Sequence, residues 1–237
     1  MSTDMESGVR RPLIAVIGDA TVQRGSDKDR LAEEIGRALV DAGHRVLTGA
    51  LGGVMESACR GARGSPEYRS GDTVGVLPGH DAREANQCVD IAIATGLDHV
   101  RNSIVAHADA VIAIGGGAGT MSEICLAWMY RRLIIALRVD GWSGRIADQR
   151  IDDRVRYPDE PDDRVFGAAS THEAMILLRE RLSRFRGQHS GVRRRDGGVV
   201  RSALEGGRGS DRPRQPGLRS VDNLRPIFDP SCGDDPA

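Results

Sequence analysis

The chain has 237 residues, 39% of them hydrophobic, and a formal net charge of -1 at pH 7. This length is sufficient for one α/β domain with a buried core, and the near-neutral charge disfavours nucleic acid as a partner. The four cysteines are widely spaced without a C-x-x-C pair, so we expect neither a disulfide framework nor a metal site. No apolar stretch resembles a signal core or a membrane span, and we therefore expect a cytoplasmic protein that does not bind membranes.

Short apolar segments and amphipathic segments alternate along the chain. The apolar segments are typical of buried strands, and we expect strands at residues 12–18, 44–50, 73–78, 88–95, 110–114 and 133–138. The amphipathic segments have apolar residues at helical spacing, and we expect helices at residues 26–43, 52–63, 97–108, 120–132 and 170–185. Residues 141–164 interrupt this alternation and are expected to form a loop near the carboxyl edge of the sheet.

The composition divides the chain into three predicted parts. Residues 1–10 are polar and are expected to be a disordered N-terminus, and residues 11–186 form one domain. Residues 187–237 are rich in Gly, Pro and Arg with few apolar residues, which predicts a disordered tail. Within the domain, alternating strands and helices predict an α/β fold: a doubly wound, mostly parallel Rossmann-like sheet with helices on both faces.

Glycine-bearing turns follow three of the predicted strands. Ligands of such sheets bind beyond the carboxyl ends of the strands, and helices that begin directly after a glycine turn present free N–H groups to an anion. We therefore predict a phosphate site formed by Gly18, Gly49, Gly52, Gly53, Gly116, Gly117, Gly119 and Thr120. A structural alternative stays open, because Thr120-x-x-Glu123 also fits a capping box at the start of a helix.

The single lysine of the chain, Lys28, disfavours several enzyme classes. The P-loop signature G-x-x-x-x-G-K-[ST] is absent from the sequence, which excludes P-loop NTPases. A pyridoxal enzyme needs a lysine in its pocket, and Lys28 lies at a polar helix start. The first turn, GDATVQRG, lacks G-x-G-x-x-G, which disfavours a dehydrogenase-type dinucleotide site.

Three segments carry a family resemblance: TGALGGVMESACRGA, VGVLPGHDAREANQCVDIAIATGLDHVRN and ADAVIAIGGGAGTMSE. They resemble the LOG-like (SLOG) Rossmann superfamily over about residues 11–185, and most of all the branch that includes the molybdenum cofactor carrier proteins. The LOG enzymes of this superfamily hydrolyse nucleoside 5′-monophosphates to free base and ribose 5-phosphate. The resemblance implies a homo-oligomer, and we predict no cofactor.

The LOG signature P-G-G-x-G-T-x-x-E corresponds here to GGGAGTMSE, with Gly115 in place of the proline. By this resemblance the glycines and Thr120 bind the 5′-phosphate. Glu123 is the acid/base or stabilises the oxocarbenium-like state, and Arg101 is the catalytic arginine. Arg101 lies one residue out of register with the family, and Asn102 replaces the usual lysine. The alternative for Arg101 is a surface arginine in a solvated ion pair.

The sequence leaves three functions open, all of which bind a small phosphorylated ligand. They are a nucleoside 5′-monophosphate phosphoribohydrolase, a non-catalytic carrier of a phosphopterin such as molybdenum cofactor, and a nucleotide sensor. The retained glutamate favours the enzyme, whereas the replaced proline and the shifted arginine favour a binder. Further candidates for the same crevice are Asp81, Glu84, Asn86 and Trp142.

Overall fold

A parallel sheet of seven strands forms the centre of the domain. The structure, a computed structural model, describes residues 10–185, so the predicted tail and residues 1–9 of the predicted N-terminal segment lie outside the described residues. The strand order is β4-β3-β2-β1-β5-β6-β7, and every neighbouring pair is parallel. The strands are β1 (Leu13–Gly18), β2 (Arg45–Thr48), β3 (Thr73–Leu77), β4 (Ile91–Ala94), β5 (Ala110–Ile114), β6 (Leu133–Leu137) and β7 (Phe166–Ala168).

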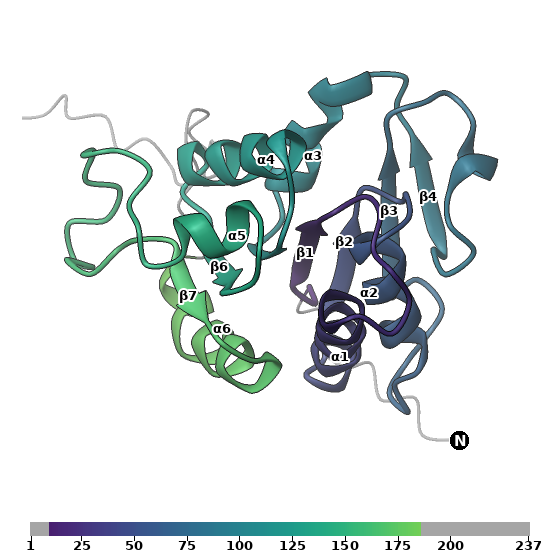
Figure 1. The fold of residues 1–237 in the computed structure, drawn as a ribbon, viewed down its shortest axis with the longest axis horizontal. Helices are drawn as coiled ribbons and strands as arrows, with labels where there is room; N and C mark the ends of the chain where they lie inside the picture. Colours follow the sequence, from purple (N-terminus) through teal and green to yellow (C-terminus); the bar gives the residue numbers. More distant parts are fainter. Residues whose placement is uncertain (1–9, 186–237) are drawn as a thin grey trace, which may run out of the picture. The chain divides into compact units, whose positions relative to one another are not determined.

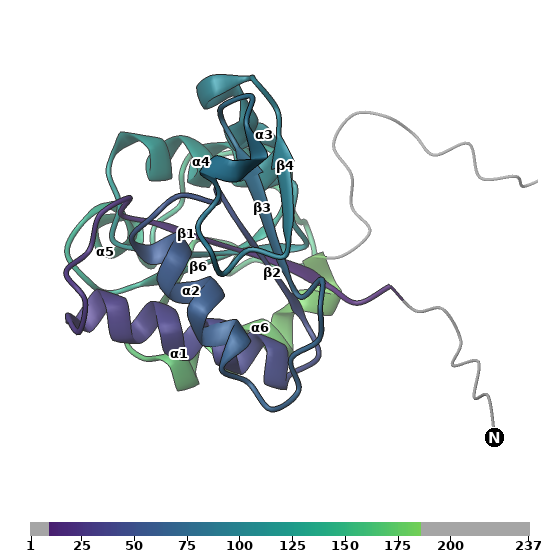
Figure 2. The same ribbon diagram turned by 90° about the vertical axis from the view of Figure 1, so that its right-hand side faces the viewer.

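Helices cover both faces of this sheet, as Figures 1 and 2 show. One face packs against α1 (Asp27–Asp41), α2 (Val54–Arg63) and α6 (Thr171–Phe185). The other packs against α3 (Asn102–Ala106), α4 (Ala118–Met129) and α5 (Trp142–Ile146). The arrangement confirms the predicted α/β, doubly wound, Rossmann-like fold.

The central strands are continuous apolar runs because both of their faces are covered. Every residue of β5 and of β6 is buried. The side chains of successive residues in a strand point to opposite faces of the sheet. Ile112 therefore packs in the hydrophobic cluster that includes α1, α2 and α6, while Ala113 packs in the cluster that includes α3 and α4. The edge strand β4 differs, because Ile91 and Ile93 are exposed.

Two elements were not predicted from the sequence, and one predicted helix needs correction. Strand β7 and helix α5 are not among the predicted elements, since three and five residues are too few to show a period. The single helix predicted at residues 97–108 is wrong, because residues 98–101 form a 3-10 turn and only Asn102–Ala106 are α-helical.

The segment after α5 does not stay at the carboxyl edge of the sheet, and that prediction is also wrong. The Arg156 guanidinium donates hydrogen bonds to the carbonyl groups of Trp128 and Arg132, each at 3.2 Å. These carbonyls lie where α4 ends and β6 is about to begin, which is the amino edge. The chain has to cross back to the amino edge after α5, because β7 pairs in parallel with β6 and must begin at that edge.

The strand order places the topological switch point between β1 and β5. From β1 the chain turns to α1 on one face, and from β5 it turns to α4 on the other, so a crevice opens between the two connections. Within residues 10–185, no helix combines the length and the apolar character that a membrane span requires.

Candidate functional site

The glycine turn after β5 leads directly into the N-terminus of α4. Gly115 and Gly116 have positive φ values of 67° and 94°, a region that favours glycine. Gly117 is the N-cap residue, and the Met121 N–H donates to its carbonyl at 3.0 Å. The N–H groups of residues 118–120 therefore have no acceptor within the helix. A Cβ atom at Gly117 or at Gly119 would meet no atom within 4 Å, so open space faces this helix start.

The position of the N-cap shows that the capping-box interpretation of Thr120 and Glu123 is wrong. Gly117 makes no side-chain cap, and Thr120 already lies inside the first turn of α4. The Thr120 hydroxyl donates instead to the Gly18 carbonyl at 3.1 Å, which ties the helix start to the end of β1. Glu123 is buried and lies one turn further along α4, so it does not cap the start of this helix.

Arg101 and Glu123 form a buried ion pair at the crevice. The Arg101 Nη1 atom lies 3.4 Å from the Glu123 Oε1 atom, and each side chain is 9% exposed. The guanidinium covers the backbone at Gly49, where a Cβ atom would lie 2.5 Å from Nη1. Arg101 is therefore not the surface arginine of the alternative interpretation, and Gly49 is a glycine because the guanidinium occupies the space of a side chain.

Burial controls the titration of both partners. It raises the pKa of Glu123 to about 7, although the charge of Arg101 acts in the opposite direction. Burial also lowers the pKa of the Arg101 guanidinium, with Glu123 opposing the change. A carboxyl group with this pKa populates both protonation states near neutral pH, which is the property required of a general acid or base.

These groups line one cavity of about 470 Å³ at the switch point. Its walls include six of the predicted site residues: Gly18, Arg101, Gly117, Gly119, Thr120 and Glu123. The volume lies within the usual range for small-molecule sites. The fold thus brings predicted residues from β1, the 3-10 turn and α4 around the same space, although they are distant in the chain.

The other four predicted glycines shape the neighbouring turns and do not line this cavity. Gly53 has a φ of 64°, and a Cβ atom there would lie 2.2 Å from the Asp19 carbonyl oxygen. The Val54 N–H donates to that same carbonyl at 3.0 Å, so the start of α2 faces the chain after β1 rather than a ligand space. Gly52 lies beside the same segment, and Gly116 packs against the Thr120 side chain.

Asp19, His99 and Asn102 also line the cavity, and they are not among the site residues predicted from the sequence. Asn102 is 5% exposed and donates to the Ser122 hydroxyl at 2.8 Å. Asp19 directly follows Gly18 at the end of β1, and its position at a strand end is the signal that identifies it. The cavity therefore has more polar groups than the signature residues alone.

The additional candidates from the sequence do not line this cavity. Asn86 donates to the carbonyls of Ala50 and Leu51, and so braces a turn in which Ala50 has a φ of 65°. Asp81 accepts hydrogen bonds from Arg83. In the part of the chain that the structure describes, no group of three or more His, Cys, Asp or Glu side chains is arranged to hold a metal ion.

A model of the SLOG cluster4 family matches residues 11–175. The chain belongs to the SLOG cluster4 family. This SLOG protein is 38% identical over 110 residues to an uncharacterized protein of Archaeoglobus fulgidus, a match that spans 46% of the chain and 70% of the relative. The predicted superfamily is thereby confirmed.

Two solved structures similar to the SLOG protein are described as molybdenum cofactor proteins. The molybdenum cofactor binding protein from Rippkaea orientalis is 31% identical with a TM-score of 0.58, over 72% of this chain and 97% of that one. The molybdenum cofactor carrier protein from Chlamydomonas reinhardtii is 28% identical with a TM-score of 0.58, over 73% of this chain and 99% of that one. The resemblance to the carrier branch is thus confirmed.

The SLOG protein departs from the LOG signature in backbone conformation as well as in sequence. Gly115 stands in place of the signature proline and has a φ of 67°, whereas a proline ring holds φ near −65°. A proline is therefore incompatible with this turn. The Gly115 N–H donates to the Ser143 hydroxyl at 2.7 Å, and the Ser143 N–H returns a bond to the Gly115 carbonyl at 3.0 Å.

Proposed function

We propose that this SLOG protein binds the phosphate group of a small phosphorylated ligand at the N-terminus of α4. The observation that carries the proposal is the open space at Gly117 and Gly119, which exposes the first N–H groups of a twelve-residue helix. A helix N-terminus favours an anion through these N–H groups and through the helix dipole. The Thr120 side chain holds this start in place through its bond to the Gly18 carbonyl.

The rest of the ligand occupies the cavity between the phosphate position and the Arg101–Glu123 pair. A nucleoside 5′-monophosphate or a phosphopterin suits a cavity of about 470 Å³ with both apolar and polar walls. Leu51 and Met55 supply apolar surface, while Asn102 and His99 supply polar groups.

The buried carboxyl group suits hydrolysis of an N-glycosidic bond. Water attacks the ribose carbon as the bond to the base breaks, the base leaves with a proton, and ribose 5-phosphate remains. Protonated Glu123 gives its proton to the leaving base, the carboxylate that results stabilises the positive charge on the ribose, and this carboxylate then takes a proton from the attacking water. Arg101 holds the carboxyl group in position across the 3.4 Å contact.

A non-catalytic carrier for molybdenum cofactor is the second candidate. Two observations favour it: two of the similar solved structures are described as molybdenum cofactor binding or carrier proteins, and Gly115 has a conformation that the LOG proline cannot adopt. In a carrier, the Arg101–Glu123 pair would fix the ligand without a chemical step.

The phosphate site is tested by calorimetric titration with AMP and with inorganic phosphate. Gly119→Ala places a methyl group in the open space, and we expect about a tenfold loss of affinity with no loss of fold. Gly116→Ala is the matched comparison: at a φ of 94° and 2.3 Å from the Thr120 Oγ1 atom, the new Cβ should lower the Tm. Unchanged affinity in a folded Gly119→Ala protein contradicts the phosphate site.

The two candidate functions are separated by a turnover assay. Purified protein is incubated with a panel of nucleoside 5′-monophosphates, and free base is followed by chromatography. For a hydrolase, we expect Glu123→Gln to reduce base release by about 10²–10⁴-fold, and Glu180→Gln, an exposed glutamate on α6, to leave it unchanged. Binding of ligand without release of base by the wild-type protein supports the carrier instead.

A further inference from the structure

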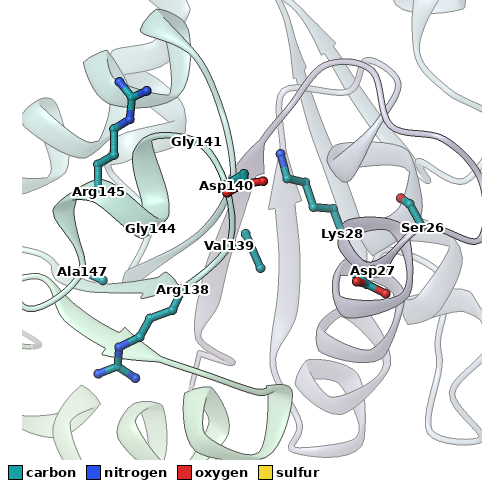
Figure 3. A pocket seen from close by; sticks show the side chains of 10 residues that line it. All are labelled: Ser26, Asp27, Lys28, Arg138, Val139, Asp140, Gly141, Gly144, Arg145 and Ala147. Atoms are coloured by element: carbon teal, nitrogen blue, oxygen red, sulfur yellow. The ribbon is translucent and has the colours of Figure 1, made fainter.

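A second and larger cavity lies beside the glycine turn, at the same edge of the sheet. It has a volume of about 910 Å³ and lies between the start of α1 and the segment from β6 to α5 (Figure 3). Lys28, Arg138 and Arg145 line it, together with the carboxyl groups of Asp27 and Asp140. The function proposed above does not use this cavity.

Lys28 connects the second cavity with the first. Its Nζ atom lies 2.6 Å from the Oδ2 atom of Asp19, which lines the first cavity. Both groups lie against the glycine turn, since a Cβ atom at Gly115 would be 2.3 Å from that carboxylate and 2.8 Å from Nζ. An ammonium group has three donors, so the bond to Asp19 leaves donors for a ligand.

Three of the other four charged groups of this cavity are held by their own neighbours or extend away from its centre, whereas the fourth, the Asp140 carboxylate, extends toward the same space as Lys28 (Figure 3). Arg138 pairs with Asp148 at 2.7 Å, and Asp27 pairs with Arg30. The Arg145 guanidinium lies 5.4 Å from the ring centroid of Trp142. Figure 3 shows Lys28 extending into the space between the two elements, whereas Arg138 and Arg145 extend away from it. Lys28 is therefore the cation available to an anion in this space.

The distance between the two anion positions restricts the class of ligand. Gly115 lies beside Lys28, and Gly117, two residues later, is the N-cap of α4. The Cα atoms of these two glycines are therefore at most about 7.6 Å apart. Two phosphoryl groups of one diphosphate can thus contact the α4 N–H groups and the Lys28 ammonium. The organic group attached to the second phosphate would then lie in the cavity beside Lys28.

We propose that the cavity beside Lys28 is a second subsite, and that the ligand is a diphosphate-bridged compound with one organic group in each cavity. Lys28 binds the second phosphoryl group, while α4 binds the first. This inference rests on the phosphate site proposed above and names the substrate class for it.

The single lysine allows a direct test in the full chain. Expression with ¹³C-labelled lysine labels only Lys28 and leaves all three donors of its ammonium group in place. We expect diadenosine diphosphate to shift the signal of the Lys28 ε-methylene group until it saturates. A Lys28 signal that does not move during this titration overturns the proposal.

Calorimetry in parallel separates this inference from the proposed function. We expect the wild-type protein to bind diadenosine diphosphate about tenfold more tightly than AMP. In Lys28→Met the two affinities should become equal, whereas Arg37→Met, which removes an exposed charge further along the same helix, should preserve the tenfold ratio. AMP binding with no advantage for the dinucleotide overturns the second subsite alone, whereas a wild-type protein that binds neither compound overturns both proposals.

Discussion

At the scale of single residues, Glu123 should dominate the pH dependence of the site. Its pKa is raised by burial from 4.5 to about 7, so the unfolded chain ionises this group before the folded protein does. The contribution of Glu123 to stability is therefore fully present below about pH 4.5 and is lost as the pH rises to about 7. Over this pH range, we expect the free energy of unfolding to lose roughly 3 kcal/mol through Glu123.

Chemical denaturation of the wild-type and Glu123→Gln proteins across this pH range measures the effect. The free energy of unfolding of the wild type should fall relative to the variant, while other titrating groups cancel in the difference. Glu180→Gln, an exposed glutamate on α6, is the matched control and should follow the wild type. Parallel curves for Glu123→Gln and the wild type contradict the raised pKa.

At the scale of elements, Asp29 joins α1 to α2. Its carboxylate accepts hydrogen bonds from the Ser57 hydroxyl at 2.5 Å, from Arg60 at 2.6 Å and from the Gly25 N–H at 2.7 Å. Burial alone would raise its pKa, but these bonds outweigh burial and hold the pKa at about 2. Asp29 therefore stabilises the fold above about pH 4, and this contribution is lost as the pH falls toward 2.

We expect Asp29→Asn to lower the free energy of unfolding at pH 7 by roughly 2 kcal/mol, with a smaller difference near pH 2. Asp27→Asn is the control on the same helix turn, because the Asp27 side chain is 86% exposed, and its effect should stay within about 0.5 kcal/mol. Urea unfolding at both pH values checks the prediction, which fails if the two variants are equally stable.

Arg156 holds the segment between α5 and β7 in place. Its guanidinium makes two hydrogen bonds to the Asp163 carboxylate, at 2.9 and 2.6 Å, and lies 3.6 Å from the ring centroid of Trp128. Both charged side chains are buried. Removal of one partner leaves a buried charge unpaired, so Arg156→Met should cost about 3–5 kcal/mol of stability.

Arg154→Met is the control in the same segment, because the Arg154 side chain is 70% exposed in its pair with Asp152. We expect its cost to be below about 1 kcal/mol. Thermal unfolding of the two variants should give a much lower Tm for Arg156→Met than for Arg154→Met. Equal Tm values would show that the buried pair does not anchor the segment.

At the scale of the whole molecule, the predicted homo-oligomer would cover the exposed edge of the sheet. Ile91 and Ile93 on β4 are 48% and 45% exposed, and an unprotected edge strand favours pairing with another chain. Light scattering after gel filtration should show an oligomer that the double variant Ile91→Lys/Ile93→Lys dissociates. Val155→Lys, which changes a residue that is 68% exposed elsewhere, should not; a monomeric wild-type protein contradicts the prediction.

The sequence by itself determined the fold class, because the alternation of buried strands with amphipathic helices is a local pattern. It also predicted six of the residues that line the cavity at the switch point, since strand ends such as Gly18 and the turn before Gly117 share one edge of a parallel sheet. The short elements α5 and β7 could not be predicted, because they are stabilised by contacts distant in the chain rather than by a period of their own.

Only the tertiary structure decided what the polar residues do. Thr120 and Glu123 fit a capping box equally well in sequence, and the choice depends on where α4 begins, which the contact of Thr120 with Gly18 helps to set. Lys28 lies at a polar helix start in the sequence, yet folding brings its ammonium group beside Asp19 at the glycine turn. Burial and charge pairing depend on neighbours from distant segments, and these neighbours exist only once the sheet has formed.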